Sequence, residues 1–405
     1  CLMFIAPVLL LYLVLVVLVG VTVMLGELAL GRRSGKSAVS TYRGLSKKYT
    51  WLGYAGIVCG FCIMCFYFVL GGIVLRYAVG YFLAIFGGSE FAWSGQGTGF
   101  FGYFLTDTNS MILFFVLYIL LNILVVSGGV QGGIEKFCNV GMPALFCLLV
   151  FIILYIACQP GAAEGYKFMF TPRWEALKDP MIWIWAMGQA FFSLSVTGSG
   201  MIVYGAYLSK DEDVVGVAQH TALFDTIAAV VAALVIIPAC FSYGLDVGAG
   251  PSLLFVTLPT ILQDIPMGRL FAIILYLAMI FAGVSSLQNM FEAVAESLLH
   301  KFPKLSRTAV LAILCVLCLG IGIFMEPISK WGPWMDLVSI YIIPIGATLG
   351  AISWFYVMKK DELLAAVNTG SKKERGALWY NVGRFVYVPL AVILCCVALF
   401  MHVAF

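Results

Sequence analysis

The sequence predicts an all-α polytopic membrane protein with about ten transmembrane helices. Of its 405 residues, 62% are hydrophobic and 11% are charged, whereas a soluble domain is about 45–50% apolar and about 25% charged. The apolar residues form long stretches, and roughly 20 such residues are enough to cross a bilayer. Lys and Arg gather in a few of the connecting loops. These observations exclude a soluble enzyme, a nucleic-acid-binding protein and a disordered chain.

The apolar stretches define ten spans that together form a single transmembrane domain, residues 1–405. Several are longer than a bilayer requires, which indicates tilt or extension into a loop. The segment 250–265 is too short and too interrupted by Pro to cross, so we predict a structured loop or re-entrant piece there. The spans lie near residues 4–30, 54–86, 111–127, 139–158, 181–207, 215–243, 268–299, 307–325, 334–358 and 381–404.

The distribution of Lys and Arg predicts the orientation in the bilayer. Loops 31–50 and 359–384 hold most of these residues, and positively charged loops stay in the cytoplasm. Residue 1 is therefore expected outside. The chain opens on Cys1, with no positively charged segment before the apolar residues, which does not match a signal peptide. We expect it to be a piece of a longer protein that carries another helix upstream.

The span 181–207 is predicted to be a broken helix. Its centre, from Ser193 to Gly200, reads SLSVTGSG. Backbone groups freed inside a membrane must face a cavity or a ligand, and broken helices form the binding sites of many transporters. A close helix contact through small residues is the plainer alternative, but the run is too rich in hydroxyls for that to be our first choice.

Asp225 and several hydroxyls are predicted to lie near the membrane midplane. Asp225 is ten residues into its span, about 15 Å deep by helix rise, and an acid at that depth is by default a functional site. Tyr67, Ser285 and Ser286 lie at similar depth in other spans. Oxygen ligands suit a hard cation such as Na⁺ rather than zinc, copper or iron.

Two further groups of residues have plainer interpretations. Glu27 lies near the end of its span, where it could accept hydrogen bonds from an interrupted neighbouring helix. Two C-x-x-C arrangements, ending at Cys65 and Cys318, have purely apolar flanks and no nearby His. They indicate small residues on buried helix faces rather than zinc or redox chemistry.

Three stretches make the chain resemble the neurotransmitter:sodium symporter family. GQAFFSLSVTGSGMIVYGAY, within a specific motif at 167–213, is similar to the broken sixth helix of that family. GELALGRRSG resembles the end of its second helix, and FAGVSSLQNMFE resembles its eighth. The resemblance implies the leucine-transporter fold, with two inverted five-helix repeats, and a bacterial amino-acid transporter. The chain would then supply helices two to eleven. The first helix of the family, which provides ligands to both sodium ions and to the substrate carboxylate, is absent from the sequence.

The resemblance also implies roles for individual residues. Tyr67 would close over the substrate carboxylate, Phe192 would be an aromatic lid, and Asp336 would be the acid of the outer gate. Glu27 and Gln189 would brace the unwound region. Substrate-binding residues would be Ile63, Tyr67, Phe192, Ser193, Ser195, Gly198, Leu287 and Met290, and sodium ligands would be Ser193, Asp225, Ala282 through its carbonyl, Ser285 and Ser286.

The sequence departs from the family at Asp225, where many members have Asn, and at Ala229, where chloride-dependent members have a hydroxyl. We hypothesise that Asp225 supplies a fixed negative charge and that transport needs no chloride. The expected function is sodium-coupled symport of an amino acid by alternating access, in the lipid bilayer of a prokaryotic inner membrane, with sodium ions as ligands and no other cofactor. The alternatives are a proton-coupled carrier that uses Asp225, a non-transporting amino-acid sensor or fragment, and a membrane enzyme. No catalytic motif supports the enzyme.

Overall fold

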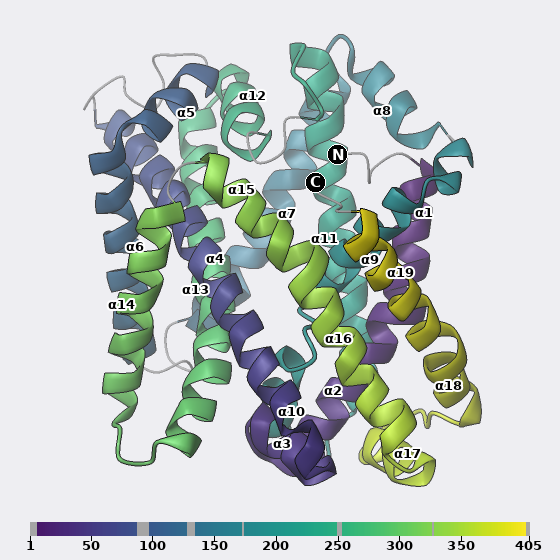
Figure 1. Ribbon diagram of the computed structural model, residues 1–405. Helices are drawn as coiled ribbons and strands as arrows, with labels where there is room; N and C mark the ends of the chain where they lie inside the picture. The colour runs from purple at the N-terminus through teal and green to yellow at the C-terminus, as the bar shows by residue number, and fades with distance from the viewer. Residues whose placement is uncertain are drawn as a thin grey trace.

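The computed structural model describes residues 6–86, 97–127, 134–171, 174–248, 253–325 and 328–401, and these residues form helices without strands (Figure 1). Nine helices in this part of the chain are long and apolar enough to cross a membrane. They are α1–η2–α2 (Ala6–Leu15, Val16–Gly20, Val21–Ser34), α4 (Thr50–Ile85), α6 (Thr108–Ser127), α7 (Ile134–Ala157), α11 (Val214–Tyr243), α13 (Gly268–Lys301), α14 (Arg307–Met325), α15–η7–α16–η8 (Ile328–Asp336, Leu337–Ile342, Ile343–Ile352, Ser353–Val357) and α18–η9–α19 (Ala377–Asn381, Val382–Tyr387, Val388–Met401).

The tenth predicted span is the broken one, and it forms α9 (Pro180–Ser193) and α10 (Gly200–Tyr207). Several observed helices extend past their predicted ends. For example, α4 begins at Thr50 rather than near residue 54, because a helix can continue beyond the hydrocarbon core where its polar residues meet water. As predicted, the segment around 250–265 does not cross: η6 (Leu253–Thr257) and α12 (Leu258–Asp264) form a short apolar helix there.

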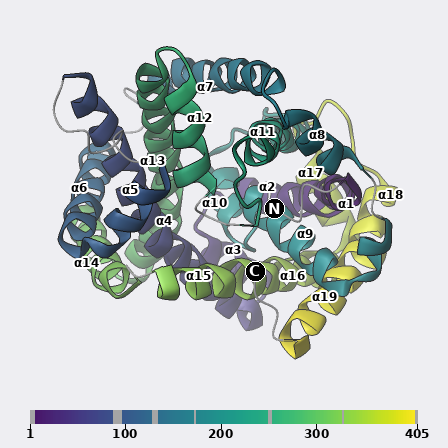
Figure 2. The ribbon, with the colours of Figure 1, turned by 90° about the horizontal axis from the view of Figure 1, so that it is seen from above.

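Short helices cover the two ends of the bundle. At one end lie α3 (Ala38–Leu45), followed by η3 (Lys47–Tyr49), and α17 (Lys360–Asn368); at the other lie α5 (Gly97–Thr106), α8 (Ala162–Phe170) and α12 (Figure 1). The turn η5 (Trp174–Lys178) precedes α9. Seen from above, α10 lies near the middle, with α6 and α14 towards one edge and α18 and α19 towards the opposite edge (Figure 2).

Two glycines allow α2 and α10 to cross closely. A Cβ built on Gly31 would meet the carbonyl of Ile202, and one built on Gly205 would meet the carbonyl of Leu28. Small residues let membrane helices approach until their backbones touch. This contact places the broken helix directly beside α2, which carries Glu27.

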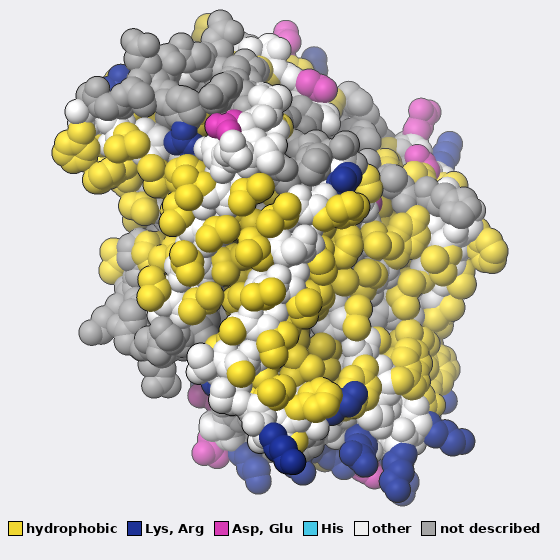
Figure 3. All heavy atoms as spheres, turned by 60° about the vertical axis from the view of Figure 1, so that its left-hand side comes forward, with side chains coloured by type: hydrophobic (Ala, Val, Ile, Leu, Met, Phe, Trp, Pro, Cys, Tyr) yellow, Lys and Arg dark blue, Asp and Glu magenta, His cyan; other side chains and the backbone are white. Residues whose placement is uncertain are grey.

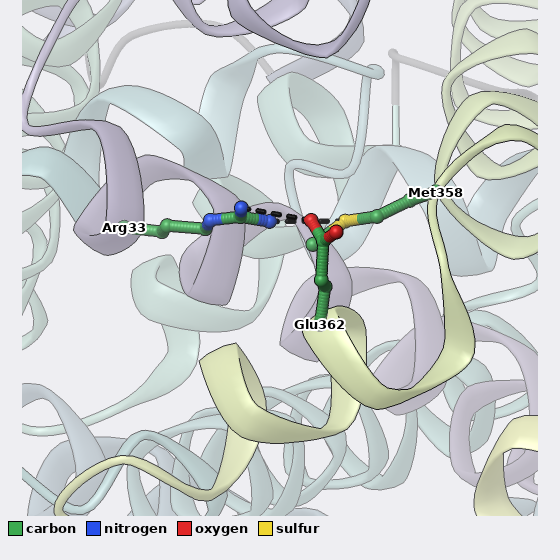
Figure 4. A network of polar contacts seen from close by, with 3 residues as sticks. All are labelled: Arg33, Met358 and Glu362. Atoms are coloured by element: carbon green, nitrogen blue, oxygen red, sulfur yellow. Dashed lines mark hydrogen bonds and ion pairs between the residues drawn. The ribbon is translucent and has the colours of Figure 1, made fainter.

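The charged side chains mark the end of the bundle that we assign to the cytoplasm. Lys and Arg gather at the lower end of the molecule, below a wide hydrophobic belt (Figure 3). There Arg33 Nη2 lies 2.9 Å from Glu362 Oε2 of α17, and its Nη1 lies 3.6 Å from Met358 Sδ (Figure 4). The buried Arg32 donates to the carbonyl oxygens of Glu212, Ala366 and Thr369. The positively charged end of α2 is thus fastened to α17.

Candidate functional site: a cavity beside a broken helix

The helix over 181–207 is interrupted between Ser193 and Gly200. Asp179 begins α9 by accepting a hydrogen bond from Met181 N at 2.9 Å, and Pro180 occupies the first turn, where its missing N–H leaves no helical hydrogen bond unmade. In the unwound segment Ser195 has φ 55° and Gly198 has φ 81°. Glycine adopts such a conformation readily, whereas serine does so at a cost. The segment between Ser193 and Gly200 is therefore not helical, as the sequence predicted.

The polar backbone of the unwound segment is satisfied by other parts of the protein. Glu27, which is fully buried, accepts hydrogen bonds from Gly198 N at 2.8 Å and from Met201 N at 3.0 Å. Thr197 Oγ1 accepts one from Gly200 N at 2.9 Å. The first donors of α10 are thus held by groups of this chain, as buried backbone groups in a membrane require.

Tyr42 of α3 holds the same segment from the end of the bundle where Lys and Arg gather. Its hydroxyl donates to the carbonyl of Gly198. Burial raises the pKa of Tyr42 well above its ordinary value, so the hydroxyl stays protonated and remains a donor. Together, Glu27 and Tyr42 fix both polar groups of the Gly198 backbone.

A cavity of about 100 Å³ lies against the break. On the same measure one water needs roughly 10–15 Å³, so the cavity has room for a small molecule. One face of α4 contributes Gly56, Gly60, Ile63 and Tyr67, at the spacing of successive helical turns. The broken helix contributes Phe192, Ser195, Thr197, Ser199, Gly200 and Tyr204. The remaining lining residues are Ser286, Met290 and Ala293 of α13 and Ile343 of α16.

Aromatic rings close the end of the cavity that points away from the end of the bundle rich in Lys and Arg. The ring centroids of Tyr67 and Phe192 are 6.4 Å apart, and Phe66 stacks on Phe192 at 6.0 Å. Trp331 of α15 packs on Phe66 at 6.4 Å. Asp336, the predicted outer-gate acid, is the last residue of the same helix. We call Tyr67, Phe192 and Phe66 the aromatic cover of the cavity, and α15 packs against this cover through Trp331.

Asp225 forms a second polar cluster next to the break. Its Oδ2 accepts hydrogen bonds from Ser193 Oγ at 2.6 Å and from Tyr12 OH at 3.5 Å. These three residues come from α11, α9 and α1, so the carboxylate joins helices that are distant in sequence. Gln189 lies one helical turn before Ser193 in α9. The cluster is a set of oxygen atoms, which suits a hard cation.

The pair Ser285 and Ser286 divides between two environments in α13. Ser285 Oγ donates to the carbonyl of Ala282 at 2.9 Å, so these two expected sodium ligands contact each other. Ser286 lines the cavity. A second space, of about 200 Å³, is lined by Tyr67, Ala282 and Ser286. Ala282, Ser285 and Ser286 lie on one stretch of α13, and their role as ligands of the second sodium stays a prediction.

Most of the expected substrate-binding residues line the cavity, and three do not. Ile63, Tyr67, Phe192, Ser195 and Met290 are on its wall. Ser193 turns to Asp225 instead. Leu287 is fully buried in the core and is not among the residues that line the cavity. The Cβ direction of Gly198 points at the carbonyl of Gly346 in α16, because the positive φ turns this residue away from the cavity.

Several lining residues were not identified from the sequence. Gly56 and Gly60 lie on the same face of α4 as Ile63 and Tyr67, and the helical spacing alone could have indicated them. Tyr204 follows the break by one turn of α10. Tyr12, which contacts Asp225 and does not line the cavity, could not be identified from the sequence, because the two residues are 213 positions apart.

A helical multi-pass protein with a central cavity on an interrupted helix has the architecture of a secondary transporter. Residues 104–404 match the model of the sodium:neurotransmitter symporter family. The chain is 33% identical over 402 residues to the uncharacterized sodium-dependent transporter YhdH of Bacillus subtilis (strain 168), covering 95% of this chain and 88% of that protein.

Two further comparisons agree with this match. The uncharacterized sodium-dependent transporter MJ1319 of Methanocaldococcus jannaschii is 30% identical over 394 residues, covering 91% of this chain and 78% of that protein. The crystal structure of MhsT in complex with L-phenylalanine superimposes with a TM-score of 0.90 at 30% identity, covering 97% of this chain and 92% of that chain. The chain belongs to the sodium:neurotransmitter symporter family and is a sodium-coupled, multi-pass membrane transporter with the leucine-transporter fold.

Proposed function

We propose that this protein is a symporter that carries an amino acid into a prokaryotic cell together with sodium and without chloride. The observation that carries the proposal is the cavity beside the broken helix. It combines apolar walls at Ile63, Phe192 and Met290 with hydroxyls at Tyr67 and Ser195. Few polar groups in an otherwise apolar cavity are typical of a small-molecule site.

The proposed substrate is an amino acid whose carboxylate meets the hydroxyl of Tyr67 and whose side chain lies along Ile63 and Met290. Phe192 covers it from outside, and Asp336 belongs to the outer gate. The solved relative MhsT is described in complex with L-phenylalanine, which supports an amino-acid substrate. Alternating access then requires the aromatic cover and the cytoplasmic side of the cavity to open in turn.

The proposed sodium ligands form two groups. Ser193 and Asp225 serve the first ion, and the Ala282 carbonyl with Ser285 and Ser286 serves the second. Ser193 is on the last turn of α9 and Ser195 is on the wall of the cavity, so ion binding and substrate binding order the same unwound segment. A shared segment of this kind supplies the favourable coupling that symport needs.

Uptake into proteoliposomes tests the proposal. We expect labelled amino acids to accumulate under an inward sodium gradient and to stop accumulating when choline replaces sodium. Uptake driven by an acid pulse without sodium would favour the proton-coupled alternative. Binding of the same amino acids without any flux would favour the sensor.

Replacing chloride with gluconate should leave uptake within about twofold of its original rate. The reason is that Asp225 already provides a negative charge beside Ser193 and Tyr12, so no mobile anion is needed to balance the bound cations. Initial rates at constant sodium and osmolarity measure this. A large loss in gluconate would contradict the assignment of Asp225 as the fixed anion.

A further inference from the structure

A groove of about 480 Å³ lies on the outer surface of the bundle, apart from the cavity beside the break. Its wall is formed by α1–η2–α2, by α11 and by residues 375–379 at the start of α18. Val17 is 65% exposed and Leu223 is 53% exposed, so the groove opens towards the lipid. Among the described residues, its wall includes none from α4, α9, α10 or α13. The groove is therefore separate from the space beside the broken helix.

The groove extends through about one leaflet of the bilayer. Along α1–η2–α2 its wall runs from Leu25 to Leu13, which is about 18 Å of helix rise. Half of a hydrocarbon core about 30 Å thick is about 15 Å. The helix that carries Leu25 ends with Arg32 and Arg33 in its last turn. One end of the groove therefore lies towards the end of the bundle where Lys and Arg gather.

The wall along this length is almost entirely apolar. It includes Val16 and Val21 on one side and Ala222 and Leu223 of α11 on another. The hydroxyl of Thr22 donates to the carbonyl of Leu18 at 2.7 Å, within its own helix. This part of the groove therefore suits an apolar chain, which gains by packing along apolar surface.

The end rich in Lys and Arg brings two buried hydrogen-bond donors to the groove. Arg375 and Trp379 both line it. The Nε of Arg375 and the Nε1 of Trp379 are buried, and neither has a hydrogen-bond partner among the described residues. A buried donor without an acceptor costs about 1–3 kcal/mol. Both groups donate and cannot accept, so the group that satisfies them must be an acceptor.

Neighbouring residues hold Arg375 and Trp379 in position. Asn368 of α17 accepts from Arg375 N at 2.7 Å through Oδ1 and donates to the carbonyl of Arg375 at 2.9 Å through Nδ2. The ring of Trp379 packs on Phe355, with 5.5 Å between the ring centroids. The backbone of Arg375 and the indole of Trp379 are therefore fixed before any ligand binds, which lowers the entropic cost of binding.

The charge around these donors favours an anion. The loop 371–376 reads SKKERG, so three basic residues accompany one acidic residue. Arg forms strong charge-assisted hydrogen bonds with phosphate, and Trp is enriched at the level of lipid headgroups. Basic pockets between transmembrane helices bind acidic headgroups. A phosphate that carries an apolar chain therefore fits both the donors and the wall.

We propose that this groove binds one acidic phospholipid, such as phosphatidylglycerol. Its phosphate accepts hydrogen bonds from Arg375 and Trp379, and one acyl chain lies along α1–η2–α2 and α11. The lipid thereby contacts the helix that carries Glu27 and the helix that carries Asp225. The proposal is independent of which substrate the protein carries.

The test titrates the purified protein, delipidated in detergent, with phosphatidylglycerol and with phosphatidylcholine of the same acyl chains. Native mass spectrometry counts the bound lipids. We expect one phosphatidylglycerol to bind at least tenfold more tightly than phosphatidylcholine. R375Q should weaken its binding at least roughly tenfold, the scale of a hydrogen bond to a charged group. W379F, which keeps an aromatic ring against Phe355, should weaken it about 2- to 10-fold.

The control for R375Q is K372Q. It removes the same charge from an exposed position of the same loop that does not line the groove, and it should bind phosphatidylglycerol within about twofold of wild type. A single species in size-exclusion chromatography and a thermal unfolding midpoint near that of wild type check that each variant is folded.

The apolar wall is tested with V17W, which puts an indole into the groove from an exposed position. It should weaken the binding of both lipids at least tenfold. The matched control is V316W on α14, because Val316 is 67% exposed and Val17 is 65% exposed, and this variant should bind both lipids as wild type does.

Three results would overturn the proposal. Equal affinities for the two lipids, unchanged in R375Q and W379F, would show that the groove does not recognise a headgroup. A loss in K372Q as large as that in R375Q would assign the preference to general surface charge. Displacement of the lipid by inorganic phosphate, together with normal binding in V17W, would show that the site takes an anion and not a lipid.

Discussion

Replacing Asp225 with asparagine should raise the sodium concentration for half-maximal uptake at least roughly 30-fold. Asparagine keeps the size of the side chain and an oxygen that can accept from Ser193 Oγ, which lies 2.6 Å from Oδ2 in this structure. It removes the negative charge. Losing one partner of a buried charge pair costs about 2–5 kcal/mol, and 2 kcal/mol corresponds to about 30-fold in affinity. Initial uptake rates over a sodium series balanced with choline measure the change.

The control for this variant is D246N. Asp246 is an exposed carboxylate just beyond the C-terminal end of α11, the helix that carries Asp225, and it accepts from Gly248 N at 2.8 Å. Its replacement should leave the sodium dependence unchanged. If chloride partly restored D225N, a fixed negative charge at this position would be supported directly. A sodium curve for D225N that matched wild type would place the first sodium elsewhere.

Replacing Glu27 with alanine should abolish uptake and destabilise the protein by about 2–6 kcal/mol. The reason is that Gly198 N and Met201 N, at 2.8 and 3.0 Å from the carboxylate, would lose their acceptors, and a buried unsatisfied group costs about 1–3 kcal/mol. E27Q should lose less, because its amide oxygen can still accept from one of the two donors. Thermal unfolding in detergent, followed by intrinsic fluorescence, measures the loss alongside uptake.

Glu362 provides the matched control for this experiment. Its ion pair with Arg33 at 2.9 Å is 46% exposed on both sides, and exposed pairs contribute about 0–1 kcal/mol. E362Q should therefore unfold close to the wild-type temperature and retain uptake. If E27A behaved like E362Q, the hydrogen bonds from Glu27 would not be what holds the unwound segment.

The fold and the position of the break were predictable because they depend on local sequence. Long apolar runs define membrane helices, and the eight residues SLSVTGSG combine hydroxyls, β-branching and glycine at mid-span. Local sequence also identified Glu27, because a carboxylate near the end of an apolar helix needs hydrogen-bond donors from its neighbours. These features do not require knowledge of the neighbours in space.

The details of the cavity were less predictable because both faces of a membrane helix are apolar. In α4 the buried face and the outward face read alike, so amphipathicity does not show which residues line a cavity. Gly60 is an ordinary glycine in the sequence, and only the folded structure shows that it lines the cavity. The orientation of Gly198 follows from its φ of 81°, and the contact of Tyr12 with Asp225 follows from tertiary packing.

The central claim is that sodium and an amino acid move together through the site at the broken helix. It is tested most directly with proteoliposomes that hold the same ²²Na⁺ concentration inside as outside, to which an inward gradient of L-phenylalanine, the amino acid bound in the solved MhsT structure, is then added. Symport predicts that the inward phenylalanine gradient drives ²²Na⁺ inward above equilibrium, and that D225N removes this accumulation. Phenylalanine influx without any movement of ²²Na⁺ would contradict the account.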